Sequence, residues 1–145
     1  MKISECMTRD VRLASPDMTL REAARLMGEC DAGVLPVGEN DRLVGMLTDR
    51  DIAIRGIAEG KGPDAKVREA MTEEVRWCFE DDDADEALQT MADEQIRRMP
   101  VLSRQKRLVG IVSLGDLTEA CRPQETGQTL SAISRAGGQH NQSIH

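Results

Sequence analysis

The chain contains two copies of one unit, and this internal repeat constrains the fold more than any other feature. The segment Leu43–Asp51 reads LVGMLTDRD and returns as LVGIVSLGD at Leu108–Asp116. Other landmarks repeat with an offset of 64 residues: Met7-Thr8 with Met71-Thr72, and Pro36-Val37 with Pro100-Val101. A repeat of this length predicts a duplicated globular half, because two large copies close on each other whereas solenoid units stack indefinitely.

Length and charge exclude several classes of protein. At 145 residues the chain has room for about one domain, so we expect the two copies to share a core. A net charge of −7 argues against nucleic-acid binding and against a basic membrane-binding patch. The single Trp, single Phe and absence of Tyr leave almost no surface for base stacking. Without a long apolar run or a signal-peptide pattern, a cytoplasmic location is expected.

The cysteines and histidines do not form a recognisable metal or catalytic motif. Cys6, Cys30, Cys78 and Cys121 are unevenly spaced and form no C-x-x-C pair. Buried or inactive thiols are the favoured interpretation, and a redox-sensitive pair is the alternative. His140 and His145 fall in a polar, glycine-containing tail and are expected to be solvated. No metal site is predicted.

Each copy has the pattern of a β-α-β-β-α unit. Strands are expected at 11–14 and 75–79, each followed by a helix with Thr19 or Asp83 as N-cap and an acid three residues later. Helical spacing predicts two core-facing stripes: Leu20, Ala23, Ala24 and Met27 in the first copy, and Ala84, Ala87, Leu88 and Met91 in the second.

The second half of each unit is predicted to be a hairpin and a closing helix. Strands at 33–37 and 98–102 contain a proline, which indicates an edge or strand-end position. Each turns into the glycine-containing strand, and a helix follows from residue 52 or 117. The fold class is therefore α/β, with tandem β-α-β-β-α repeats at 1–64 and 65–122. Residues 123–145 form a tail for which a short helix at 125–135 and then a flexible end are expected, unless the tail orders on a partner.

The turn after each glycine-containing strand is the candidate ligand site. Thr48 and Asp51 stand where a strand ends and a helix begins, and Ser113 and Asp116 repeat them. A hydroxyl and free backbone N–H groups at such a turn can donate to a phosphate, while the carboxylate can accept from a ribose. Gly45 and Gly110 would let a backbone approach closely. For a single copy an N-cap box is the favoured explanation, but two copies in matching context favour a ligand site instead.

These motifs, in this order and twice, resemble the CBS-domain family, named for cystathionine β-synthase. The resemblance spans about residues 1–122, and the run Met46–Asp51 is similar to the stand-alone bacterial two-repeat proteins of the hypoxic-response type. It implies a pseudo-twofold CBS-domain pair, called a Bateman module, with two clefts between the repeats and a dimer shaped like a flat disc. The ligand that it implies is AMP, ADP, ATP, NAD(H) or S-adenosylmethionine.

The resemblance also implies roles for matching positions. Thr48 and Ser113 would face phosphate, and Asp51 and Asp116 would hold ribose. The adenine would meet two backbone positions and two side chains: Val11 and Val75, and Leu35 and Met99. The copies differ in charge, because Asp49 would repel phosphate in the first, unless Arg50 and Arg55 offset it, whereas Arg97 and Arg98 would attract it in the second. Solvent exposure alone is the alternative explanation for these arginines.

The sequence favours a non-enzymatic regulatory module that binds an adenosine-containing ligand and signals energy or redox state, as in a stress response. We expect no obligatory cofactor, a homodimer formed through the closing helices, and an unidentified regulated protein. The dimer residues would be Ile52, Ile54, Ile57 and Leu117. An enzyme is disfavoured because neither repeat contains a histidine. A dimeric scaffold with unoccupied clefts is the remaining alternative.

Overall fold

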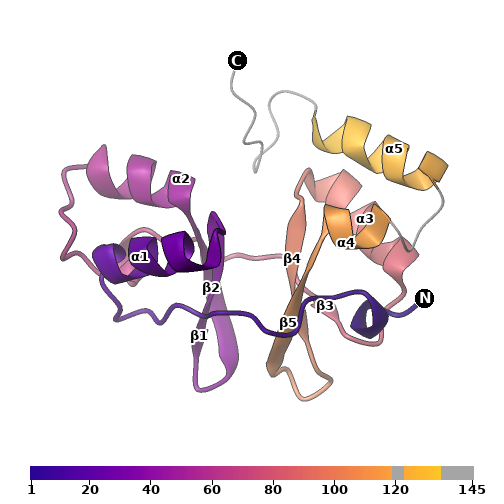
Figure 1. Cartoon of the computed structure of the whole chain (residues 1–145), viewed down its shortest axis with the longest axis horizontal. Coiled ribbons are helices and arrows are strands. Elements are labelled where there is room, and N and C mark those ends of the chain that lie inside the picture. Colours follow the sequence, from indigo (N-terminus) through magenta and orange to yellow (C-terminus); the bar gives the residue numbers. More distant parts are fainter. Residues whose placement is uncertain (119–122, 135–145) are drawn as a thin grey trace. The chain divides into compact units, whose positions relative to one another are not determined.

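The chain divides into two compact units that cut across the sequence repeats. The structure is a computed structural model that describes residues 1–118 and 123–134 (Figure 1). Among the described residues, unit 1 contains 1–10, 76–105, 109–118 and 123–134. Unit 2 contains residues 11–75 and 106–108.

Unit 2 carries the body of the first repeat. Its elements are α1 (Leu20–Cys30), β1 (Val34–Glu39), β2 (Arg42–Thr48), α2 (Asp49–Asp51), the π-helical η2 (Ile52–Ile57) and the 3-10 helix η3 (Val67–Glu69). The strands β1 and β2 form an antiparallel hairpin in which Val34 pairs with Thr48. Asn40 and Asp41 turn the hairpin with positive φ angles, as short hairpin loops require. As predicted, Thr19 caps α1, with its Oγ1 accepting from the Glu22 N–H at 3.1 Å.

Unit 1 carries the body of the second repeat. Its elements are η1 (Ile3–Glu5), β3 (Cys78–Phe79), α3 (Ala84–Glu94), β4 (Arg98–Leu102), β5 (Leu108–Ser113), α4 (Leu114–Thr118) and α5 (Pro123–Ile133). The sheet order is β3-β4-β5, and β3 runs parallel to β4. Asp83 caps α3, as expected, by accepting from the Asp85 N–H at 3.3 Å.

Each unit is completed by the opening segment of the other repeat, residues 1–10 for unit 1 and 65–75 for unit 2. Thr8 and Ile111 exchange two backbone hydrogen bonds of 2.9 and 3.0 Å. Thr72 and Met46 do the same, with both bonds at 2.9 Å. The predicted boundaries 1–64 and 65–122 follow the repeats of the sequence. Each compact unit instead combines the body of one repeat with the opening segment of the other.

The buried hydrophobic residues form two clusters, one in each unit, and each cluster contains residues from both repeats. The core of unit 1 includes Ile3 from the opening segment and Ile133 from α5, and the core of unit 2 includes Val67 and Ala70. All four predicted residues of the α3 stripe are buried. In α1 the stripe differs at one position: Ala24 is exposed, and Leu26 is buried instead.

Three local expectations need correction. Residues 11–14 form no strand, and only Ala14 makes a bridge, to Val37. Pro100 lies in the central strand β4, which is tolerated because the two-residue β3 pairs only with Val101 and Leu102, beyond the proline. The tail helix begins at Pro123 and is packed, because Ile133 is 3% exposed in the core and Gln95 donates to the Ala132 carbonyl at 3.0 Å. Residues 135–145, with both histidines, and Cys121 lie outside the described residues.

Candidate functional site

The hydroxyl and acid of each repeat form the same reciprocal pair of hydrogen bonds. In unit 2 the Asp51 N–H donates to Thr48 Oγ1 at 3.0 Å, and the Thr48 N–H donates to Asp51 Oδ2 at 3.0 Å. In unit 1 the Asp116 N–H donates to Ser113 Oγ at 3.1 Å, and the Ser113 N–H donates to Asp116 Oδ2 at 2.9 Å. These are complete capping boxes, so both turns have a structural role whether or not a ligand binds.

The capping boxes also leave groups available for a ligand. Asp51 and Asp116 are half-buried, and within residues 1–118 and 123–134 neither Oδ1 atom takes part in a hydrogen bond. The hydroxyls of Thr48 and Ser113 accept from the backbone and keep their own hydrogen to donate. Each turn therefore offers a fixed carboxylate oxygen, suited to a hydroxyl donor such as ribose, beside a hydroxyl donor suited to phosphate.

Gly45 and Gly110 allow the opening segment of the other repeat to lie close against their strands. A methyl group on Gly45 would lie 2.7 Å from the Thr72 carbonyl oxygen and 3.1 Å from Met71 Sδ. A methyl group on Gly110 would lie 2.6 Å from the Thr8 carbonyl oxygen and 3.0 Å from Met7 Sδ. The close approach expected at each glycine is thus made by the protein's own backbone. It places Thr72 beside the strand that ends at Thr48, and Thr8 beside the strand that ends at Ser113.

The residues predicted to meet adenine differ in their exposure. Val11 and Val75 are half-buried. Leu35 is 2% exposed and Met99 is 0% exposed, each inside the core of its own unit. A base at either side chain would have to replace core contacts, so contact of Leu35 or Met99 with adenine stays a prediction.

The charges beside the two turns are opposite. In unit 2 the Asp49 N–H donates to the Gly33 carbonyl at 2.9 Å, and the Asp49 carboxylate lies over Gly33, where a methyl group would meet Oδ2 at 2.8 Å. The matching bond in unit 1 joins the Leu114 N–H to the Arg97 carbonyl at 2.8 Å. Arg97 thus takes the place of Gly33, and Leu114, 9% exposed, takes the place of Asp49.

The arginines near the turns differ in their partners. The side chains of Arg97 and Arg98 are exposed and have no hydrogen bond or ion pair among the described residues. Arg55, which the sequence suggested as a cation to offset Asp49, donates instead to the Met71 carbonyl at 3.3 Å. Arg9 donates to the Ser4 carbonyl at 3.2 Å.

Two cysteines of unit 1 have raised pKa values. Burial, followed by the charge of Asp116, raises the pKa of the half-buried Cys6 thiol. Burial raises the pKa of Cys78 to about 12. Protonated thiols are poor nucleophiles, so these values favour the inactive-thiol interpretation over a redox-sensitive pair. The position of Cys6 close to Asp116 has no signal in the sequence, because it follows from the exchange of opening segments.

Neither a metal-ligand group nor a membrane span was found in the described part of the chain. Within residues 1–118 and 123–134, no cluster of three or more His, Cys, Asp or Glu side chains is placed to hold a metal ion. Over the same residues, no helix is long and apolar enough to cross a membrane.

The family is established by comparison with known proteins. The CBS domain model matches the chain twice, at residues 3–55 and 67–122. The chain belongs to the CBS domain family. It is 41% identical over 144 residues to the CBS domain-containing protein YhcV of Bacillus subtilis, covering 99% of this chain and 98% of that protein. It is 38% identical over 131 residues to hypoxic response protein 1 of Mycobacterium tuberculosis, covering 89% and 91% of the two chains.

Solved structures have the same fold as this CBS-domain pair. Hypoxic Response Protein I, solved with two coordinated zinc ions, has a TM-score of 0.76 and 38% identity, covering 83% of this chain and 99% of that chain. The CBS domain pair of protein MJ0100, in complex with 5'-methylthioadenosine and S-adenosyl-L-methionine, has a TM-score of 0.73 and 26% identity, covering 83% and 94%. The predicted family and fold class are therefore confirmed.

Proposed function

We propose that this CBS-domain pair is a non-enzymatic regulatory module that binds an adenosine-containing ligand at the Thr48–Asp51 and Ser113–Asp116 turns. The observation that carries the proposal is the reciprocal capping box, present twice, which fixes each aspartate with one oxygen still available to a ribose hydroxyl. The complex of MJ0100 with two adenosine compounds supports this class of ligand. Occupancy of the two turns is the signal that the module passes on, in response to energy or redox state.

The two alternative functions are a scaffold and an enzyme. A scaffold would retain both capping boxes without binding a nucleotide, so it differs from the proposal in ligand affinity alone. An enzyme would need a nucleophile and a base, and the raised pKa values of Cys6 and Cys78 work against a thiolate nucleophile at either position.

The test is calorimetric titration of the intact protein and of Asp51→Ala and Asp116→Ala with AMP, ATP, NADH and S-adenosylmethionine. Loss of a charge-assisted hydrogen bond costs about 1.5–3 kcal/mol, so each variant should weaken one site by roughly 10- to 100-fold and leave the other unchanged. Asp83→Ala is the matched control, because it removes an aspartate cap from α3 without touching either turn. Unchanged affinity and stoichiometry in both variants would refute the site assignment. Binding of none of the four compounds to the intact protein would favour the scaffold.

A homodimer is the second part of this proposal. Ile54 is 45% exposed and Ile57 is 71% exposed on η2, a large apolar surface for a short helix. Ile52 is half-buried against the unit 2 core. Leu117 is 0% exposed in the unit 1 core, so its predicted place at a dimer interface is wrong. A twofold contact through η2 would cover Ile54 and Ile57. Light scattering that shows a monomer at micromolar concentration would exclude it.

A further inference from the structure

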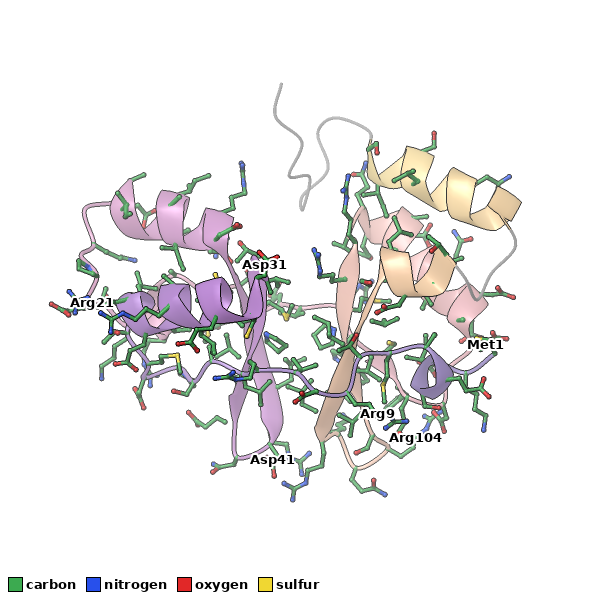
Figure 2. The ribbon with its side chains drawn as sticks, in the orientation of Figure 1. Met1, Arg9, Arg21, Asp31, Asp41 and Arg104 are labelled. Atoms are coloured by element: carbon green, nitrogen blue, oxygen red, sulfur yellow. The ribbon has the colours of Figure 1, made fainter. Side chains whose placement is uncertain are left out.

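The two turns differ most in charge, and the difference extends over matching positions. Three of the acidic residues around the end of α1 and the start of α2 are Asp31, Asp49 and Asp51, of which Figure 2 labels Asp31. The residues at the matching positions of unit 1 are Gln95, Leu114 and Asp116. Two of the three carboxylates of unit 2 are thus replaced by neutral side chains in unit 1.

The cations show the opposite pattern. Unit 1 has Arg97 and Arg98 at the start of β4, and the Arg97 carbonyl is bonded directly to Leu114, the residue after Ser113. Unit 2 has Gly33 and Val34 at these positions, and the Asp49 carboxylate occupies the space that a side chain at residue 33 would need. Arg50 is the cation that remains near Asp49, since Arg55 is bonded to the Met71 carbonyl.

A local hydrogen bond fixes one of these carboxylates in unit 2. The Asp49 carboxylate accepts from the Arg50 N–H at 2.8 Å, which holds it at the helix start. Asp31 ends α1 in a left-handed conformation, a position that Gln95 takes in unit 1, where its side-chain amide is bonded to the Ala132 carbonyl. A phosphate beside Thr48 would therefore lie next to the Asp49 carboxylate. One beside Ser113 would lie next to Leu114, whose N–H is bonded to the Arg97 carbonyl. The exposed side chains of Arg97 and Arg98 have no hydrogen bond or ion pair among residues 1–118 and 123–134.

We propose that the two turns select different adenosine compounds: the Ser113–Asp116 turn takes a phosphorylated one, and the Thr48–Asp51 turn takes one without phosphate. This rests on the proposed function and deepens it by assigning a ligand class to each turn. The positive charges of Arg97 and Arg98 favour phosphate at the Ser113–Asp116 turn. The negative charge of Asp49 disfavours phosphate at the Thr48–Asp51 turn. An uncharged or cationic group on the 5' carbon of the ribose suits the carboxylates of unit 2. The protein then compares two kinds of adenosine metabolite.

The experiment compares AMP with 5'-methylthioadenosine by calorimetry in two variants. Asp51→Ala leaves the Ser113–Asp116 turn and should bind AMP at least about tenfold more tightly than 5'-methylthioadenosine. Asp116→Ala leaves the Thr48–Asp51 turn and should reverse that preference. Both preferences should weaken as salt is raised, because screening acts on exposed charges. Circular dichroism confirms that each variant is folded.

Three further substitutions assign the effect to particular side chains. When Arg97→Ala or Arg98→Ala is added to Asp51→Ala, each should lower the affinity for AMP by about tenfold and leave the affinity for 5'-methylthioadenosine unchanged. Lys2→Ala is the charge-matched control in unit 1 and should change neither affinity. In Asp116→Ala, the paired change Gly33→Arg with Asp49→Leu reproduces the unit 1 side chains and should raise AMP affinity by about tenfold. Asp49→Asn is the milder version if that protein does not fold.

The outcomes separate this inference from the proposed function. Equal ratios of AMP to 5'-methylthioadenosine affinity in Asp51→Ala and Asp116→Ala would overturn the charge selection while leaving adenosine binding intact. Failure of the intact protein to bind either compound would overturn the proposed function and this inference with it. A reversed preference between the two turns would show that charge acts opposite to the proposal.

Discussion

The substitution Gly110→Ala tests whether the exchanged opening segment is part of the folded core of unit 1. The added methyl group would lie 2.6 Å from the Thr8 carbonyl oxygen and 3.0 Å from Met7 Sδ. The Thr8 carbonyl oxygen itself accepts from the Ile111 N–H at 3.0 Å, and the Thr8 N–H donates to the Ile111 carbonyl at 2.9 Å, so relief requires the opening segment to move. Gly110 has no positive φ angle, and alanine is therefore disfavoured by contact alone.

Two routes give the same magnitude for this effect. Overpacking a tight site typically costs about 1–3 kcal/mol. If the segment moves instead, two backbone hydrogen bonds are lost, at about 0.5–1.5 kcal/mol each. We therefore expect the free energy of unfolding to fall by roughly 2 kcal/mol and the melting temperature by roughly 5–8 °C. Gly45→Ala should have a similar effect in unit 2, because its methyl group would meet the Thr72 carbonyl oxygen at 2.7 Å.

Urea denaturation and amide hydrogen exchange together provide the assay. Gly28→Ala is the matched control, since this glycine lies inside α1 with nothing within 4 Å of an added methyl group. That variant should gain up to about 1 kcal/mol from helix propensity. In Gly110→Ala the amides of Thr8 and Ile111 should lose protection before those of α3. An unfolding free energy equal to that of the unmodified protein, or unchanged protection at Thr8 and Ile111, would refute the reasoning.

Three other predictions concern the caps, the thiols and the exposed helix. Ser113→Ala removes the acceptor of the Asp116 N–H, and urea denaturation should show a loss of about 1 kcal/mol, whereas no loss would mean that the cap is not formed. The pKa of Cys78 is about 12, raised from 9.0, so its contribution to stability is complete below about pH 9 and is lost as pH rises toward 12. Urea titrations at pH 8 and pH 10.5 should show that loss, and Cys78→Ala should reduce it; an equal loss in both proteins would contradict the cause. Ile57→Glu should convert a dimer to a monomer in light scattering, and Glu29→Ala on the exposed face of α1 should not; a dimer that survives Ile57→Glu does not use η2.

The local elements could be predicted because short-range interactions decide them. The Thr19 cap, the α3 stripe and the hairpin of unit 2 depend on residues a few positions apart, and each is present as expected. The capping boxes at Thr48–Asp51 and Ser113–Asp116 follow from a three-residue spacing that the sequence displays twice. The prediction for α1 was wrong at Ala24, which is exposed, whereas Leu26 is buried. Helical spacing alone does not decide between these two positions, because the choice depends on what the helix packs against.

The sequence by itself determined the repeat, the family and the two hydroxyl–acid turns, whereas the tertiary structure decided which opening segment completes which unit. Met7-Thr8 and Met71-Thr72 are the same dipeptide, and Gly45 and Gly110 lie in nearly identical strands, so either segment fits either strand by local chemistry. Only the path of the whole chain selects Thr8 with Ile111 and Thr72 with Met46. The surroundings of each turn, including Cys6 close to Asp116, depend on this long-range choice, which no local pattern encodes.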